Sequence, residues 1–280
     1  MTSRDFYRIR DFVPDFDAIA EEIAARSRSL SARARMRADI SYGERPRETL
    51  DIIYPENPAG GAPLHIFIHG GYWRSGEKAD YRCVAEPALA IGAVTALIEY
   101  DLMPDQRLDV LVGQVRRAVR WLQDHAKEFG ADPGRITTSG HSAGAHLASY
   151  LAAIGPTEVS PPVLPDIKGL FLLSGIYDLS EIPDSFLRNE AAMTHFEAAS
   201  WSPLTSVQQP RPLRVIAYGG EETAPFHQQA MELHDKLRSN EQNSDLFEAQ
   251  GLNHMNVVLD LADLDGALAR RLQDLLADAR

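Results

Sequence analysis

The 280-residue sequence predicts a protein of the α/β class, with a mostly parallel central sheet of about eight strands and helices on both faces. Two observations lead to this prediction. Short, nearly continuous apolar runs recur along the chain, as is typical of strands buried on both faces of a parallel sheet. Segments with apolar residues at helical spacing separate these runs. Alternation of strands and helices on this scale indicates a parallel sheet between two helical layers.

The first expected element is a helix over residues 15–37, where apolar and charged residues alternate at helical spacing. Strands are then expected at residues 38–42, 50–54, 64–68, 93–98, 136–139, 170–173, 213–217 and 245–248. The clearest helix between them carries Leu108, Leu111, Val115, Val119 and Leu122 on one face. Residues 179–212 contain several prolines and are expected to form a small lid-like insertion, so that residues 1–280 make one domain.

Composition excludes several classes of function. The formal net charge of −12 argues against nucleic acid as a partner, because a phosphate backbone is bound by surplus Lys and Arg. A single cysteine, Cys83, excludes internal disulfides and cysteine metal clusters, and no histidine spacing indicates a metal, so no cofactor is expected. We find neither a signal-like segment nor an apolar run long enough for a membrane span, which predicts a cytoplasmic protein without a membrane partner. The sequence leaves homodimer formation open.

The strongest chemical signal is at residues 140–144, which read Gly-His-Ser-Ala-Gly. A predicted strand runs directly into this motif and a predicted helix runs out of it, which is the setting of a nucleophile elbow. The glycines are required because side chains would collide in so sharp a turn. We therefore expect Ser142 to be a nucleophile at the N-terminus of a helix.

A second motif, His-Gly-Gly-Tyr-Trp at residues 69–73, follows the central predicted strand. Acyl transfer requires preorganised donors for an oxyanion, and backbone amides next to glycines can supply them. We expect the amides of Gly71, Tyr72 and Ala143 to form this oxyanion hole. His69 is expected to brace the loop by hydrogen bonds.

The base is expected at His254, which follows the last predicted strand and precedes the C-terminal helix. In this type of enzyme the order along the chain is Ser, then the acid, then His. Imidazole can take up and return a proton near neutral pH. For the acid we favour Glu222, which follows a strand about thirty residues before His254. Glu221 and Asp178 are the alternatives.

Together these motifs resemble those of the kynurenine formamidase (arylformamidase) group, on the hormone-sensitive-lipase side of the α/β-hydrolases, and those of related bacterial carboxylesterases. The resemblance covers most of the chain and is carried by residues 42–43, 50–55, 69–73, 140–145, 174–179, 202–203 and 253–254, with Glu222, Phe226 and Gln229. It implies the α/β-hydrolase fold. It also implies an acid four residues before Phe226, usually an Asp, where this sequence has Glu222.

The expected activity is that of a serine hydrolase that cleaves a small acyl group from an aryl amide or ester through an acyl-serine intermediate. The resemblance implies N-formylkynurenine as the substrate, giving kynurenine and formate. A carboxylesterase for short-chain or aryl esters is the alternative hypothesis. A third hypothesis is a ligand-binding protein of the same fold without catalytic activity. Tyr72, Trp73 and His141 are expected to line the pocket for this small-molecule ester or amide.

Overall fold

The central feature of the computed structural model, which describes residues 4–57, 59–160 and 162–278, is an eight-stranded sheet. Its strand order is β1-β2-β4-β3-β5-β7-β9-β10. The strands are β1 (Met36–Ser41), β2 (Thr49–Ile53), β3 (Ala62–Ile68), β4 (Val94–Ile98), β5 (Ala131–His141), β7 (Gly169–Leu173), β9 (Leu213–Gly219) and β10 (Ser244–Ala249). This arrangement confirms the predicted α/β-hydrolase fold, with a strand at each expected position.

Strand direction places the chemistry at one edge of the sheet. β2 is antiparallel to both β1 and β4, whereas every pair from β4 to β10 is parallel. Most residues of β3, β4, β7 and β9 are buried and apolar, as expected of strands covered on both faces, whereas the edge strand β10 is half-buried. Because their carboxyl ends share one edge, the loops that follow β3, β5, β7, β9 and β10 meet there, which is where open α/β sheets bind ligands.

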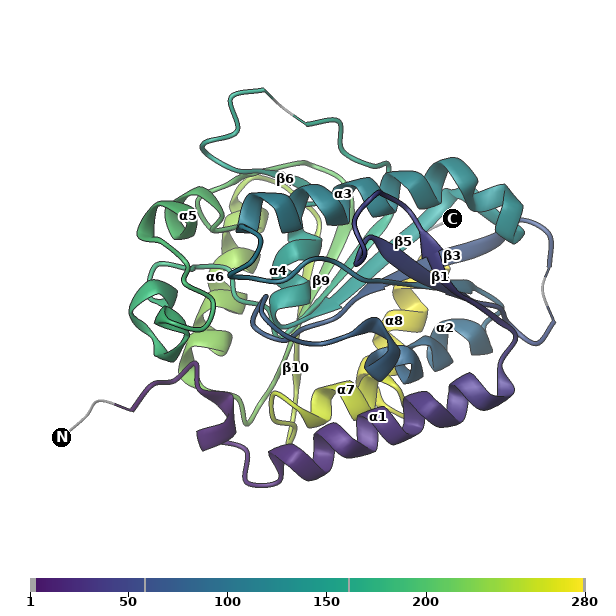
Figure 1. Ribbon diagram of the computed structural model, residues 1–280, viewed down its shortest axis with the longest axis horizontal. Coiled ribbons are helices and arrows are strands. Elements are labelled where there is room, and N and C mark those ends of the chain that lie inside the picture. The colour runs from purple at the N-terminus through teal and green to yellow at the C-terminus, as the bar shows by residue number, and fades with distance from the viewer. Residues whose placement is uncertain (1–3, 58, 161, 279–280) are drawn as a thin grey trace.

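Helices cover both faces of the sheet (Figure 1). The helices are α1 (Phe16–Arg33), α2 (Glu86–Ala90), α3 (Leu108–His125), α4 (Ala143–Ser149), α5 (His195–Ser200), α6 (Ala224–Ser239), α7 (Asn256–Leu261) and α8 (Ala267–Asp278). In Figure 1, α1, α2, α7 and α8 lie together on one side of the sheet, and α3, α4 and α6 lie on the other. The apolar side of α3 is fully buried, as its 3.6-residue spacing predicts.

The N-terminal helix is shorter than the sequence suggests. The prediction extended it to residue 37, but α1 ends at Arg33 and the chain is extended from Met36. Residues near this boundary are good helix formers. Pairing of Met36 with Ile53 of β2 nevertheless makes them a strand, so sheet hydrogen bonding overrides local helix propensity here.

The segment over residues 179–212 contains short elements only. Three-residue 3-10 helices η4 (Ile182–Asp184) and η5 (Phe186–Arg188) precede α5, and β8 (Val207–Gln208) pairs with β6 (Ala153–Ile154) outside the main sheet. Among the described residues, we find no helix that combines the length and the apolar character needed to cross a bilayer.

Candidate active site

Ser142 stands at the turn between β5 and α4. Its backbone adopts φ 56° and ψ −123°, a strained conformation for a residue with a side chain. The turn is possible because its flanking glycines allow close backbone contact. A Cβ at Gly140 would lie 2.3 Å from the Gly144 carbonyl oxygen, and one at Gly144 would lie 2.1 Å from that of Ile68. The predicted strand–turn–helix geometry is therefore present, with the Ser142 hydroxyl at the carboxyl edge of the sheet.

A continuous hydrogen-bond chain joins Ser142, His254 and Glu222. The Oγ of Ser142 lies 3.0 Å from Nε2 of His254, and the Nδ1 of His254 lies 2.8 Å from Oε2 of Glu222. The Glu222 side chain is fully buried and that of His254 nearly so. Because a carboxylate only accepts, Nδ1 carries the proton and Nε2 offers its lone pair to the serine hydroxyl. The arrangement can deprotonate Ser142.

Glu222 is also held through its second oxygen, Oε1. The backbone N–H of Gly219 donates to it at 2.7 Å, and the hydroxyl of Ser174 donates to it as well. Ser174 follows β7 and has a positive φ of 53°. Sequence reasoning did not single out Ser174 as a site residue. Its position directly after a parallel strand is the signal that could have identified it.

The two alternative acids lie outside this chain of hydrogen bonds. Glu221 is exposed, although it is the neighbour of Glu222. The carboxylate of Asp178 accepts from the backbone N–H of Ser180 at 2.9 Å, as a turn residue commonly does. Of the three carboxylates, the structure brings Glu222 to His254.

The glycine loop after β3 lies against the nucleophile. A Cβ at Gly70 would be 3.2 Å from the Cβ of Ser142, so the loop backbone approaches the serine closely. Gly71 has φ 117°, and a Cβ there would be 2.0 Å from the Ser75 carbonyl oxygen. Within the part of the chain that the structure describes, no hydrogen bond is made by the amide of Gly71 or Tyr72. The amide of Ala143, at the start of α4, belongs to the helix N-terminus and needs no intrahelical acceptor.

Tyr72 and Trp73 point in different directions, although both have positive φ angles. Tyr72 lines the pocket around Ser142. Trp73 is fully buried, and its indole N–H donates to Nδ1 of His146 at 3.0 Å. The expectation that Trp73 lines the pocket was therefore wrong. Its indole fills the core because the backbone turns it away from the cavity.

His141 connects the nucleophile turn to the base. Its Nε2–H donates to the backbone carbonyl of His254 at 2.9 Å, and its ring lines the pocket. Burial, together with the nearby His254, holds the pKa of His141 well below its ordinary value, so the ring is neutral. Among the described residues, Nδ1 of His141 has no hydrogen-bond partner. This buried acceptor lies next to the glycine loop, since a Cβ on Gly70 would be 3.2 Å from it.

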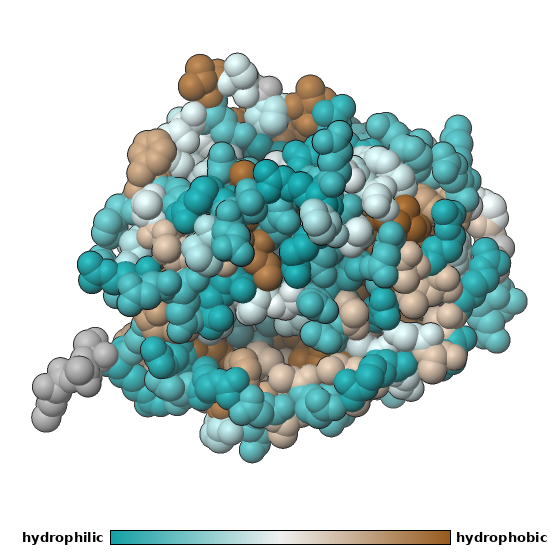
Figure 2. All heavy atoms as spheres, viewed as in Figure 1, coloured by the Kyte–Doolittle hydropathy of each residue, from teal (hydrophilic) through white to brown (hydrophobic). Residues whose placement is uncertain are grey.

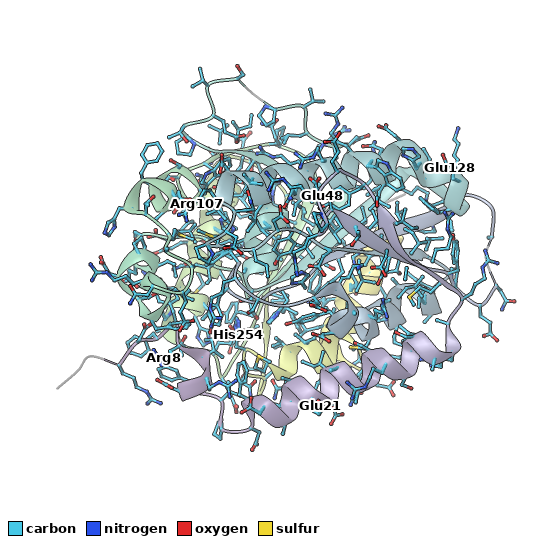
Figure 3. The ribbon with its side chains drawn as sticks, in the orientation of Figure 1. Arg8, Glu21, Glu48, Arg107, Glu128 and His254 are labelled. Atoms are coloured by element: carbon cyan, nitrogen blue, oxygen red, sulfur yellow. The ribbon has the colours of Figure 1, made fainter. Side chains whose placement is uncertain are left out.

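A pocket of about 510 Å³ opens above Ser142 and His254. Its wall opposite the sheet is supplied by the N-terminal segment, which contributes Arg8, Ile9, Arg10, Asp11, Phe16 and Ala20. Figure 2 shows the surface hollowed above α1, and Figure 3 shows Arg8 and His254 on the same side of the molecule. Sequence reasoning missed this wall, since nothing in its local pattern indicates a pocket.

Hydrogen bonds fasten the N-terminal segment over the site. The Tyr72 hydroxyl donates to the Tyr7 carbonyl at 2.8 Å and accepts from the Ile9 amide at 3.2 Å. The Thr223 hydroxyl, next to Glu222, donates to the Phe6 carbonyl at 2.8 Å. The pocket also contains charge, since Arg74 pairs with Glu190 at 2.6 Å and Arg8 lies over the Phe186 ring at 4.9 Å. In the described ranges, no group of three His, Cys, Asp or Glu side chains is arranged to hold a metal.

Comparison with known proteins identifies relatives along most of the chain. Residues 50–164 match the family described as BD-FAE. A kynurenine formamidase from Salmo salar is 31% identical, over 95% of this chain and 90% of that protein. A kynurenine formamidase from Danio rerio is also 31% identical, over 85% of this chain and 81% of that protein.

The fold is shared with solved hydrolase structures. A crystal structure of a proposed thioesterase from a Silicibacter species superposes with a TM-score of 0.79 and is 28% identical in sequence. The superposition covers 96% of this chain and 98% of that chain. The similarity therefore extends over nearly the whole chain.

Proposed function

Because this chain belongs to the kynurenine formamidase family of α/β-hydrolases, it is a hydrolase, and we propose that Ser142, His254 and Glu222 form its catalytic triad. The observation that carries this proposal is the unbroken hydrogen-bond chain from Glu222 through His254 to Ser142 at the floor of the pocket. The order of the three residues along the chain is that of an α/β-hydrolase triad.

In the proposed mechanism, Ser142 Oγ attacks the substrate carbonyl carbon while His254 Nε2 takes the hydroxyl proton. The imidazolium that results is stabilised by Glu222, and the oxyanion accepts from the amides of Gly71, Tyr72 and Ala143. When the tetrahedral intermediate collapses, His254 returns the proton to the leaving amine or alcohol. A water then attacks the acyl-serine with His254 again as the base, which releases the acid and restores the Ser142 hydroxyl.

We propose N-formylkynurenine as the substrate, cleaved to kynurenine and formate. The relatives from Salmo salar and Danio rerio are named for this activity. The pocket supports the proposal because the aromatic rings of Tyr72, Tyr81 and Phe186 line it, which suits an aryl leaving group. Arg8 lines the same pocket beside Phe186. Its guanidinium would bind the carboxylate of such a substrate.

The test is a side-by-side measurement of kcat/KM on N-formylkynurenine and on nitrophenyl esters from acetate to octanoate. A formamidase hydrolyses the formamide with efficiency at least comparable to that on the acetate ester. Efficiency that rises steadily with acyl length, with the formamide left intact, would instead identify a carboxylesterase.

Ser142→Ala should lower kcat/KM by about 10⁴-fold or more on every substrate and abolish labelling by a serine-directed phosphonate. Ser149→Ala is a matched control on α4, since the Ser149 hydroxyl donates only to a helix carbonyl, that of His146. Labelling that persists in Ser142→Ala would exclude Ser142 as the nucleophile. If the folded wild-type protein is neither labelled by the phosphonate nor active on any of these substrates, the proposed triad is contradicted. The ligand-binding hypothesis is then favoured.

A cytoplasmic location is part of the proposal. It is supported by the single cysteine of the sequence, Cys83, which cannot form an internal disulfide of the kind common in oxidising compartments. Cell fractionation tests the location, and light scattering of the purified protein distinguishes a monomer from a homodimer.

A further inference from the structure

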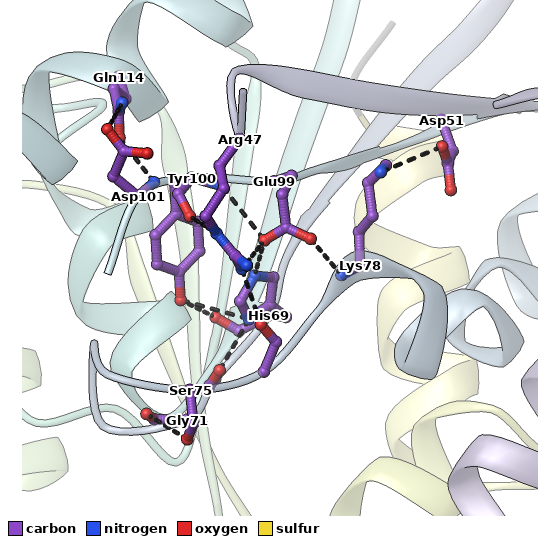
Figure 4. Close-up of polar contacts among 12 residues, drawn as sticks. Arg47, Asp51, His69, Gly71, Ser75, Lys78, Glu99, Tyr100, Asp101 and Gln114 are labelled. Carbon is purple, nitrogen blue, oxygen red and sulfur yellow. Dashed lines mark hydrogen bonds and ion pairs between the residues drawn. The ribbon is translucent and has the colours of Figure 1, made fainter. Parts of the chain in front are cut away.

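A buried polar cluster lies against the glycine loop that follows β3 (Figure 4). Its centre is His69, the last residue before the two glycines, with a fully buried side chain. Nε2 of His69 lies 2.9 Å from Oε1 of Glu99, and Nδ1 lies 2.8 Å from the carbonyl oxygen of Gly70. A carbonyl and a carboxylate only accept hydrogen bonds. The Tyr100 hydroxyl also lies 3.4 Å from Nδ1, but it donates its proton to the His69 carbonyl at 2.7 Å. Both ring nitrogens therefore lie within hydrogen-bonding distance of an acceptor and can both donate.

Glu99 is an ionised acceptor. Besides His69, the Arg47 guanidinium donates to Oε1 at 2.5 Å and the Lys78 amide donates to Oε2 at 3.0 Å. A protonated carboxyl group would leave one of these donors facing another donor. Burial alone would raise the pKa of Glu99, but the hydrogen bonds from His69 and the Lys78 amide and the charge of Arg47 outweigh it and hold the pKa below its ordinary value.

The surroundings of the His69 ring favour a cation. Tyr100 stacks on it with ring centroids 4.4 Å apart, and Tyr81 lies at 6.0 Å on a nearly parallel plane. The faces of aromatic rings attract cations. Gly76 lies over the hydrogen bond between His69 and Gly70, since a Cβ on Gly76 would be 2.7 Å from the Gly70 oxygen and 2.8 Å from Nδ1. A side chain at position 76 would therefore collide with this hydrogen bond.

From this geometry we infer that both ring nitrogens of His69 carry a proton, that Glu99 balances the charge of the ring, and that His69 positions the Gly71 amide as an oxyanion donor. The peptide bond between Gly70 and Gly71 is planar and trans, so the carbonyl of Gly70 and the N–H of Gly71 point in opposite directions. The Nδ1–H of His69 fixes that carbonyl on the buried side. The Gly71 N–H is thereby turned toward the pocket.

Two further contacts hold the same loop in place. The Tyr100 hydroxyl donates to the carbonyl of His69 at 2.7 Å, and the Ser75 hydroxyl donates to the carbonyl of Gly71 at 3.0 Å. The carbonyls of three successive residues, from His69 to Gly71, are therefore all occupied. Glu99 and His69 are positioning residues, because they act on the substrate only through the loop. The inference rests on the proposed function in one respect, namely that Gly71 is an oxyanion donor.

The charge on His69 can be measured without any reference to activity. In protein labelled with ¹⁵N-histidine, a long-range ¹H–¹⁵N spectrum at pH 7.5 distinguishes an imidazolium, with two protonated nitrogens, from a neutral ring with only one. His69 can be assigned from NOEs to the ring of Tyr100. We expect two protonated nitrogens. A neutral ring in the wild-type protein overturns the inference.

The positioning role is tested with Glu99→Gln, which has nearly the same shape but no charge to hold the second proton. Since a misdirected oxyanion donor weakens transition-state binding, kcat on nitrophenyl acetate should fall by about 10-fold to 100-fold, while KM changes by no more than about twofold. The matched control is Glu158→Gln, which removes the charge of a half-buried carboxylate, the partner of Arg116. Its kcat should stay at the wild-type value.

The outcomes separate the two proposals. Wild-type kcat in a folded Glu99→Gln protein overturns the positioning role, even if the enzyme is a formamidase. Absence of hydrolysis by the wild-type protein overturns the proposed function and leaves the charge of His69 to the NMR measurement. If Glu99→Gln does not fold, the spectrum of the wild-type protein still decides whether His69 is an imidazolium.

Discussion

At the scale of single residues, the acid of the proposed triad is a glutamate that depends on neighbours for its position. Glu222 lies three residues after the end of β9, and its fully buried carboxylate has three partners, with His254 on one oxygen and Ser174 and Gly219 on the other. A glutamate has one more rotatable bond than an aspartate. Two donors on the second oxygen compensate for that freedom, because they fix the plane of the carboxylate.

Ser174→Ala tests this support. Loss of one hydrogen bond to a buried carboxylate should lower kcat by about tenfold, with little change in KM. Ser174→Gly removes the same hydroxyl and also relieves the strain of φ 53° at this position. Both variants should therefore lose the same activity, although the glycine variant should be the more stable. If Ser174→Gly keeps wild-type kcat, the hydroxyl does not support Glu222.

The site could be predicted from the sequence wherever a motif has a fixed place relative to a strand. Ser142 and His254 both follow parallel strands, and the structure brings them within hydrogen-bonding distance. Trp73 could not be placed in the same way, because the direction of its side chain depends on a positive φ angle that its residue type does not indicate. Ser174 and Glu99 were missed because polar residues are common after strands.

At the scale of secondary structure elements, the contact between α4 and β3 is closer than any side chain allows. The Cβ of an alanine at position 144 would lie 2.1 Å from the carbonyl oxygen of Ile68 and 2.4 Å from that of His69. The helix can lie this close to the central strand only with glycine at that point. Because the same contact sets the height of Ser142 above the sheet, the glycine serves both packing and the site.

Gly144→Ala should therefore destabilise the protein by about 3 kcal/mol or more, since backbone atoms would have to move. Gly113→Ala on α3 is the matched comparison, because the nearest atom to its Cβ would be 3.6 Å away. There the added methyl should stabilise the helix by about 0.5–1 kcal/mol. Urea denaturation of both variants measures the difference. Equal stability of the two would contradict the close contact at Gly144.

The elements were more predictable than their ends. Each strand was expected from an apolar run, and burial on both faces explains why such runs are informative. The end of α1 was predicted too late in the sequence because residues 34–37 favour a helix locally. Pairing with β2 makes the chain extended there instead. The N-terminal wall was not predicted at all. Its contacts with Tyr72 join residues more than sixty positions apart in the sequence. The periodicity of apolar residues, which is a local pattern, carries no information about such contacts.

At the scale of the whole molecule, buried histidines make stability depend on pH. Burial lowers the pKa of His65 to about 3 and that of His146 to about 4, from the ordinary value of 6.5 for histidine. Below pH 6.5 the unfolded chain takes up protons that the folded protein cannot accept. The two buried histidines therefore make their full contribution to stability above about pH 6.5. As the pH falls below 6.5, each of the two histidines lowers the free energy of unfolding by about 1.4 kcal/mol per pH unit, until the pH reaches its pKa in the folded protein.

We therefore expect the free energy of unfolding to fall between pH 6.5 and pH 4.5. In His65→Gln the slope over this range should be lower by about 1.4 kcal/mol per pH unit. His195→Gln, at an exposed position, is the control and should keep the wild-type slope. Chemical denaturation at several pH values provides the measurement. An unchanged slope in His65→Gln would mean that His65 takes up a proton in the folded protein.

The N-terminal wall has a consequence for the order in which the enzyme becomes active. Residues 5–11 are synthesised early, yet the groups that hold them, including Tyr72, Phe186 and Thr223, emerge from the ribosome later. His254 emerges later still, after every strand of the sheet. Residues 5–11 must therefore wait for the rest of the chain before they can close the pocket. A nascent or truncated chain would have much of the core but no hydrolase activity, so unfinished molecules would not attack substrate.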